Sequence, residues 1–277
     1  MLSVPTLWTV FVIDFVAAAM IWAYVAITYP KLEAARFWAA SSAVGALGGF
    51  TAMLVILPLF AGGILLMLAV CLAAMGIERF YKQPVSWRRT ALITGLSSAG
   101  LLFFIFAYDS SAMRVLVYST AQSLPLALTL KLLFSHHDGR VSPGARLAGG
   151  IACLIIALYA VRAFGNLIGF DFSLTRSSLV QGALTLALIF LSMSLNFGFL
   201  LMAIGRLRNE VAELALVDDL TGVGNRRQLM QRLSRECARS ERGGEPFVLL
   251  VIDLDGVKQI NDTVVVPPAT PACSISP

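Results

Sequence analysis

Two carboxylates follow a short apolar run near the C-terminal end of this 277-residue chain. The run comprises residues 247–252, and the carboxylates are Asp253 and Asp255. A continuous apolar run of this length between turn residues is typical of a fully buried central strand. Mg²⁺ binds one or two carboxylates and shares the rest of its shell with water and substrate phosphates. The pattern is compatible with magnesium and phosphate chemistry, and its wider context decides its meaning.

A second group of polar residues and glycines lies upstream of this strand. It reads Asp218-Asp219-Leu220-Thr221-Gly222-Val223-Gly224-Asn225-Arg226-Arg227. Threonine, glycine and asparagine in this arrangement predict a turn that opens a helix. The helix is expected over about residues 225–241, with Leu229, Leu233 and Cys237 on one face. Gly243-Gly244-Glu245-Pro246 then ends it.

Together, the two groups resemble the beginning of a GGDEF domain, the domain of the diguanylate cyclase family. The first group matches the family pattern in Asp218-x-Leu220-Thr221-Gly222-x-x-Asn225-Arg226-Arg227. The second group matches it in Ile252-Asp253-Leu254-Asp255-x-x-Lys258-x-Ile260-Asn261-Asp262, about 25 residues downstream. The order and spacing of both motifs make the resemblance specific.

The resemblance implies an enzyme that condenses two GTP molecules into cyclic di-GMP, with Mg²⁺ holding the phosphates. Two such domains meet, and each presents one nucleotide. By motif position, the Asp253 carboxylate and the Leu254 backbone carbonyl would bind the metal. Substrate binding would fall to Asn261, which hydrogen-bonds guanine, and to the motif residues Lys258 and Asp262. The structural part of the motif would comprise Asp218, Leu220, Thr221, Gly222, Asn225, Arg226 and Arg227.

The resemblance covers residues 218–263 and stops after Thr263. Val257 replaces the aromatic residue usual in the family, and residues 264–277 carry neither the signature hairpin nor a second metal-binding acid. We therefore expect no intact catalytic site and no cyclase activity from the chain as written. Residues 264–277 have no charge and no periodicity. They are expected to be unstructured, either as the out-of-frame end of a truncated gene or as the tail of a degenerate protein.

The segment before the motif, residues 203–217, predicts a connector helix. Apolar residues are spaced 3-4-3 at Ile204, Leu207, Val211 and Leu214. This spacing is typical of a coiled-coil seam of about one and a half heptads. The connector is expected to join two copies of the chain in a parallel homodimer. In the alternative, it is the amphipathic end of a helix lying on its own protein.

The rest of the chain has the composition of a membrane protein. Hydrophobic residues make up 58% of the chain and charged residues 13%, and residues 1–202 hold 18 charges against 19 in residues 203–277. A membrane span needs about 20 mostly apolar residues. Seven runs qualify, at about residues 6–28, 37–56, 59–77, 91–107, 115–134, 147–168 and 179–202. The predicted fold is mainly α: a seven-helix transmembrane bundle over residues 1–202, the connector helix, and an incomplete α/β fragment.

The distribution of basic residues predicts the orientation in the membrane. With the N-terminus outside, 11 Lys and Arg residues lie in or beside the inner loops and 3 lie at the outer ends. The positive-inside rule favours this arrangement. It places the C-terminal tail in the cytoplasm. The resemblance to the diguanylate cyclase family implies that the membrane is the inner membrane of a bacterial cell. Because the basic excess lies in loops between apolar runs, nucleic acid is not expected as a partner.

Asp14 is a carboxylate inside the first predicted span. Such residues are functional candidates by default. In the alternative, Asp14 lies in the outer third of the span and reaches interfacial water or bonds a neighbouring helix. Two other functions remain open. One is a non-enzymatic membrane sensor whose tail only dimerises; the other is a small-solute transporter, for which Asp14 is the only indication.

Overall fold

The computed structural model describes residues 4–54, 56–135, 142–168, 179–214, 218, 221–244 and 246–252. It divides into two compact units, Met1–Gly205 and Arg206–Pro277. The predictions for residues 253–263, which include the metal and substrate positions, lie outside the described residues. The prediction of an unstructured segment at 264–277 also lies outside them.

Each predicted apolar run lies largely within one helix. In the described residues these helices are α1 (Val4–Thr28), α2 (Ala34–Ala52), α3 (Ile56–Phe80), α4 (Trp87–Leu102), α5 (Ser111–Leu133), α6 (Pro143–Leu167) and α7 (Leu179–Leu214). A π-helical turn, η1 (Phe103–Ala107), extends α4. The second and third runs form separate helices because the chain turns at Met53 and Leu54. Pro58 lies in the first turn of α3, where its missing amide hydrogen leaves no helical bond unmade.

Five helical segments in the described part of the chain are long and apolar enough to cross a membrane. They are Pro5–Thr28, Phe60–Phe80, Trp87–Ala107, Pro143–Leu167 and Val180–Val211. The remaining two helices of the bundle, α2 and α5, are more polar. Serines and glycines interrupt α2, and α5 contains Arg114, Gln122 and Lys131. The membrane character is therefore supported, and the count of seven spans is not confirmed.

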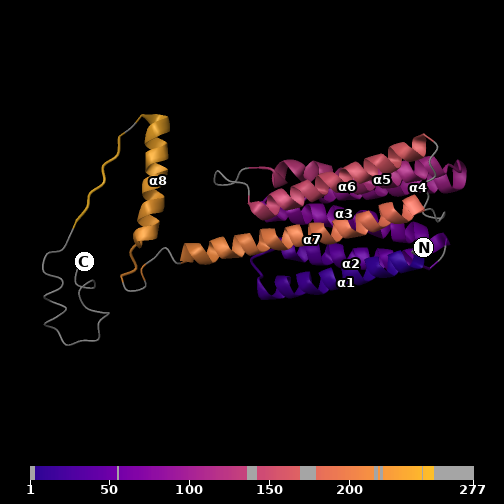
Figure 1. Cartoon of the computed structure of the whole chain (residues 1–277), viewed down its shortest axis with the longest axis horizontal. Coiled ribbons are helices and arrows are strands. Elements are labelled where there is room, and N and C mark those ends of the chain that lie inside the picture. The colour runs from indigo at the N-terminus through magenta and orange to yellow at the C-terminus, as the bar shows by residue number, and fades with distance from the viewer. Residues whose placement is uncertain are drawn as a thin grey trace. The chain divides into compact units, whose positions relative to one another are not determined.

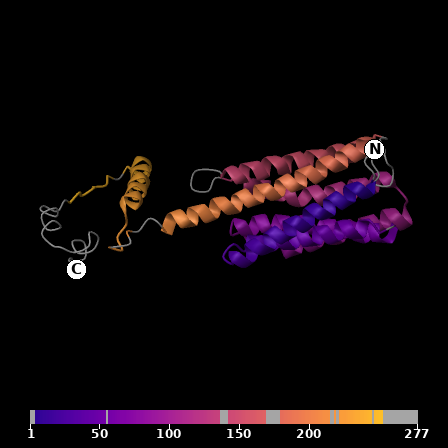
Figure 2. The same cartoon turned by 60° about the horizontal axis from the view of Figure 1, so that its bottom comes forward.

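Consecutive helices of the bundle run in opposite directions (Figure 1 and Figure 2). At one end, Arg79 near the end of α3 forms an ion pair with Glu33, which directly precedes α2. At the other end, the Asn166 amide near the end of α6 donates a hydrogen bond to the Ser111 carbonyl at the start of α5, at 3.4 Å. The α1–α2 and α3–α4 loops therefore lie at the same end, as the predicted topology requires.

Glycines bring the first three helices close together. A Cβ on Gly45 would lie 2.3 Å from the Phe15 ring of α1, and one on Gly49 would lie 2.6 Å from Phe11. A Cβ on Gly62 of α3 would lie 2.7 Å from the Gly48 carbonyl oxygen of α2. Helices in a membrane associate through such small residues because lipid supplies no hydrophobic drive between them. The glycines of α2 therefore fix its contacts with α1 and α3.

An aromatic cluster joins α1, α2 and α7. Trp38 stacks on Phe199 with ring centroids 4.8 Å apart and contacts Trp22 at 4.7 Å. The Trp22 indole donates a hydrogen bond to Asn196 Oδ1 of α7 at 3.1 Å. Asn196 thus links two helices. Ser192 instead bonds a carbonyl of its own helix.

The second unit contains α8 (Arg226–Gly243), close to the bounds predicted for it. The prediction of a buried strand after this helix is not confirmed. Residues 246–252 form no strand, and Val248 is 93% exposed. An apolar segment becomes a buried strand only when neighbouring strands pair with its backbone. The described residues of this unit supply no such partner.

Candidate functional site

The turn before α8 is built around Asp218. Its Oδ1 accepts hydrogen bonds from the Thr221 backbone amide and the Thr221 hydroxyl, both at 3.0 Å. The Gly222 amide donates to the Asp218 carbonyl at 2.9 Å, and the Asp218 amide donates to the Val223 carbonyl at 2.8 Å. Gly222 has φ +68°, a left-handed conformation that glycine adopts at little cost. The structure thus brings Asp218, Thr221 and Gly222 of the predicted motif together in one tight turn.

Asn225 connects this turn to α8. Its Oδ1 accepts a hydrogen bond from the Gln228 amide at 3.2 Å. An asparagine in this position satisfies one of the helix's first amides, which have no partner within the helix. Arg226 is the first helical residue and is exposed, and Arg227 follows it in α8. The side chains that precede α8 therefore determine where the helix begins.

The predicted metal and substrate residues lie outside the described part of the chain, as does Leu220 of the turn motif. They are Asp253, Leu254, Lys258, Asn261 and Asp262. Within the described part of the chain, no three metal-ligating side chains lie together. The donor set nevertheless suits Mg²⁺, because carboxylate and carbonyl oxygens are the hard ligands that this ion prefers. The metal prediction therefore rests on the identity of these donors.

Asp14 lies in the middle of α1 and is partly buried. Its Oδ2 is buried and has no hydrogen-bond partner among the described residues. A polar oxygen held without a partner costs free energy. Asp14 therefore differs from Asn196, whose side chain is fully engaged with Trp22 and with its own helix.

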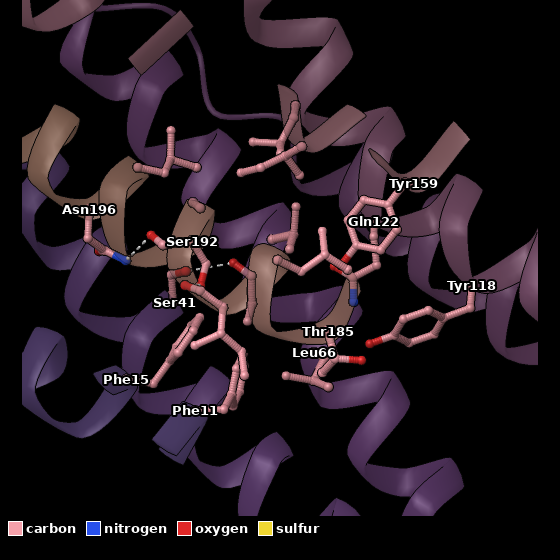
Figure 3. A pocket seen from close by; sticks show the side chains of 18 of the residues that line it. Phe11, Phe15, Ser41, Leu66, Tyr118, Gln122, Tyr159, Thr185, Ser192 and Asn196 are labelled. Carbon is pink, nitrogen blue, oxygen red and sulfur yellow. Dashed lines mark hydrogen bonds between the residues drawn. The ribbon is translucent and has the colours of Figure 1, made fainter. Parts of the chain in front are cut away.

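A cavity of about 140 Å³ lies inside the bundle, and the sequence did not predict it. Side chains from α1, α2, α3, α5, α6 and α7 line it, and Figure 3 shows most of them. Its walls are mostly apolar and aromatic, with polar groups that include Tyr118, Gln122, Tyr159 and Arg162. The spacing of these four residues in the sequence could have indicated that they lie on common helix faces. Tyr118 and Gln122 stand at i, i+4 in one predicted run, and Tyr159 and Arg162 stand at i, i+3 in another.

Comparison with known proteins was informative for the second unit. The family model described as "Diguanylate cyclase, GGDEF domain" matches residues 215–264. Response regulator PleD of Caulobacter vibrioides is 47% identical over 51 residues, which are 18% of this chain and 11% of the relative. Diguanylate cyclase DgcP of Pseudomonas aeruginosa is 50% identical over 48 residues, 17% of this chain and 7% of the relative.

Diguanylate cyclase DgcS of Shewanella oneidensis is 42% identical over 53 residues, 19% of this chain and 18% of the relative. The chain thus matches less than a fifth of the length of each of these relatives. No solved structure matches it. The comparisons confirm the resemblance over residues 215–264.

Proposed function

We propose that this chain is a membrane-bound signalling protein of the diguanylate cyclase type, and that its GGDEF segment holds part of a GTP site. The observation that carries the proposal is the family match over residues 215–264, which spans both predicted motifs. The turn at Asp218 and the cap at Asn225 give the first motif a defined geometry. The family reaction converts two GTP molecules into cyclic di-GMP and two diphosphates.

Mg²⁺ would be held by the Asp253 carboxylate and the Leu254 carbonyl. When bound, the ion neutralises charge on the phosphates of the nucleotide. Asn261 would hydrogen-bond the guanine base, while Lys258 and Asp262 would support nucleotide binding beside it. Both the metal ligands and the base contact come from one short stretch of chain, so the segment would hold one nucleotide.

The 277-residue chain by itself is expected to form no cyclic di-GMP. The family match ends at residue 264, and residues 265–277 contain no Asp, Glu, Lys or Arg. They therefore provide no side-chain carboxylate for a second metal ion and no side-chain cation for the phosphates. Incubation of the purified chain with GTP and Mg²⁺, followed by chromatography of the nucleotides, tests this expectation. Formation of cyclic di-GMP would contradict it.

A chimera tests the function of the GGDEF segment directly. Residues 1–263 would be joined to the part of DgcP that follows its own matched segment, and cyclic di-GMP would be measured in cells. The chimera should be active, and Asp253→Asn should reduce its activity by about 100-fold or more, since a metal ligand is lost. Asp219→Asn is the control, because residue 219 is a variable position of the motif. An inactive chimera, or equal effects of both substitutions, would refute the proposal.

We also propose that the bundle spans the inner membrane with the N-terminus outside. Lys31, Arg36, Arg79 and Lys82 lie in or beside the two loops joined by the Glu33–Arg79 ion pair. The positive-inside rule favours a cytoplasmic location for that end. Labelling of single cysteines at positions 82 and 109 with a membrane-impermeant reagent tests this topology. Labelling of intact cells at 82 rather than at 109 would overturn it.

Dimerisation would bring two GGDEF segments together. In the connector, Ile204 is 52% exposed and Val211 is 66% exposed. Exposed apolar residues at heptad spacing are typical of a helix that pairs with a second copy. We therefore assign the connector as a parallel homodimer contact.

A further inference from the structure

The cavity inside the bundle has two chemically different regions (Figure 3). It lies entirely within the unit Met1–Gly205 and does not depend on the GGDEF segment. Its volume of about 140 Å³ is far above the 10–15 Å³ or so that one water requires, and an apolar cavity of similar size admits a benzene-sized molecule. The cavity is therefore large enough for a small organic ligand.

One region is a polar cluster formed by α5 and α6. Arg162 is 5% exposed and Gln122 is 3% exposed. The Arg162 guanidinium lies over the Tyr118 ring at 5.9 Å, and Gln122 follows Tyr118 by one turn of α5 on the same cavity wall. Tyr159 lies close to both Tyr118 and Arg162 and adds a second hydroxyl. A permanent positive charge is thus held on the cavity wall, together with several hydrogen-bond donors.

Four other polar side chains of the cavity donate hydrogen bonds to backbone carbonyls. The Ser41 hydroxyl donates to the Ala69 carbonyl at 2.7 Å, and the Ser192 hydroxyl donates to the Ile189 carbonyl at 2.8 Å. Thr185 donates to the Gln181 carbonyl at 2.9 Å, and the Asn196 amide donates to the Ser192 carbonyl at 3.1 Å. Trp38 Nε1 is a further donor on the cavity wall, buried and without a hydrogen-bond partner among the described residues. Among the lining residues, the polar cluster alone combines a positive charge with several donors.

The other region of the cavity is apolar. Phe11 and Phe15 of α1 stack on each other with ring centroids 4.3 Å apart, and both line the cavity. Leu66, Leu126 and Leu188 contribute aliphatic surface. Burial of apolar ligand surface here stabilises the bound state. The region thus favours a hydrocarbon body.

We propose that this cavity binds a small amphipathic carboxylate. Its head would lie at Arg162, Tyr159 and Gln122, and its apolar body would lie against Phe11 and Phe15. A planar guanidinium matches a carboxylate with two parallel hydrogen bonds, and its five N–H donors allow it to do so beside other contacts. A cationic ligand would meet like charge at the same place.

The test uses the full chain in lipid nanodiscs and two carboxylate probes. Bromophenylpropionate added from water represents a soluble ligand, and bromostearate added to the lipid represents a membrane-derived one. Trp8 and Trp38 line the cavity, so a bound bromine atom should quench tryptophan fluorescence in a saturable manner. The probe that saturates identifies the source. The corresponding bromophenylpropanol and bromophenylpropylamine should bind at least about tenfold more weakly, since they lack the charged pair.

Two substitutions locate the site. Arg162→Gln should weaken binding of the carboxylate by about tenfold or more, and Tyr159→Phe by about threefold to tenfold. Arg146→Gln is the matched control, because Arg146 is exposed on the same helix and does not line the cavity. Tyr159→Phe retains the ring and therefore tests the site even if Arg162→Gln fails to fold. Unsaturable quenching, equal binding of the alcohol, or no effect of Tyr159→Phe would overturn the proposal.

Discussion

Asn225 shows how a single side chain of the GGDEF segment determines local structure. It accepts a hydrogen bond from the Gln228 amide in the first turn of α8. Loss of such a cap costs about 1 kcal/mol. Asn225→Ala should therefore speed amide exchange in the first turn of α8 by about fivefold. Hydrogen-exchange mass spectrometry of the full chain measures this, and Ser234→Ala, at an exposed position within α8, should leave it unchanged.

Substitution of Asp14, in contrast to that of Asn225, is expected to stabilise the protein. Its buried Oδ2 has no hydrogen-bond partner among the described residues, so the carboxyl group is costly where it lies. Asp14→Leu should raise the free energy of unfolding by about 1–3 kcal/mol. Thermal unfolding of the detergent-solubilised chain tests this, with Asp109→Leu as a control at an 81% exposed carboxylate. A fall in stability would indicate that Asp14 supports the bundle.

The Asp14→Leu variant also distinguishes a signalling protein from a transporter. If the variant is more stable and the protein still signals, Asp14 has a minor role in the bundle. If the variant is more stable and a solute is no longer taken up, the transporter hypothesis gains support. Uptake and stability therefore need to be measured on the same variant.

At the scale of the helices, the contact between α2 and α3 depends on Gly62. A Cβ there would lie 2.7 Å from the Gly48 carbonyl oxygen and 2.8 Å from the Ala52 amide nitrogen. These are backbone atoms of α2, so the helices must separate to admit a methyl group. Gly62→Ala should destabilise the bundle by about 1–3 kcal/mol. Gly95→Ala is the control, because nothing lies within 4 Å of its Cβ position, and it should be neutral or slightly stabilising. Equal melting temperatures for the two variants would contradict this packing.

The helices themselves were predictable, whereas their contacts were not. Apolar runs indicated the positions of α1–α7 because membrane-spanning segments must satisfy their backbone bonds internally. The cavity depends on which faces of six helices meet, and no single run contains that information. Tyr118 and Tyr159 lie in different runs, and only the packing of α5 on α6 brings them together.

The C-terminal segment shows the same limit. The turn residues and the cap predicted α8, because both act within a few residues of the chain. Residues 247–252 predicted a buried strand, but burial of a strand requires partners that are distant in sequence. In the described part of the chain these residues are exposed. The turn and the helix could therefore be predicted from sequence, whereas the burial of residues 247–252 could not.

At the scale of the whole molecule, α7 is the last helix of the bundle and directly precedes the GGDEF segment in the sequence. It is 36 residues long, which corresponds to about 54 Å, whereas the hydrocarbon core of a membrane is about 30 Å thick. About 20 residues suffice to cross it, so α7 is longer than a single span requires. The exposed apolar residues Ile204 and Val211 lie on its C-terminal part. A second copy of the chain would cover them.

Oxidative crosslinking at Val211 tests the dimer. In a background without the natural cysteines, Val211→Cys should form a disulfide-linked dimer in membranes, because the seam position of one helix faces its symmetry mate in a parallel pair. Arg208→Cys, which is exposed but lies off the seam, should crosslink at least about fivefold less. Equal crosslinking at both positions would indicate random collision, and its absence at Val211 would favour a connector that lies on its own protein. A GGDEF reaction needs two nucleotides held by two segments. Only preferential crosslinking at Val211 is therefore compatible with cyclase-type signalling.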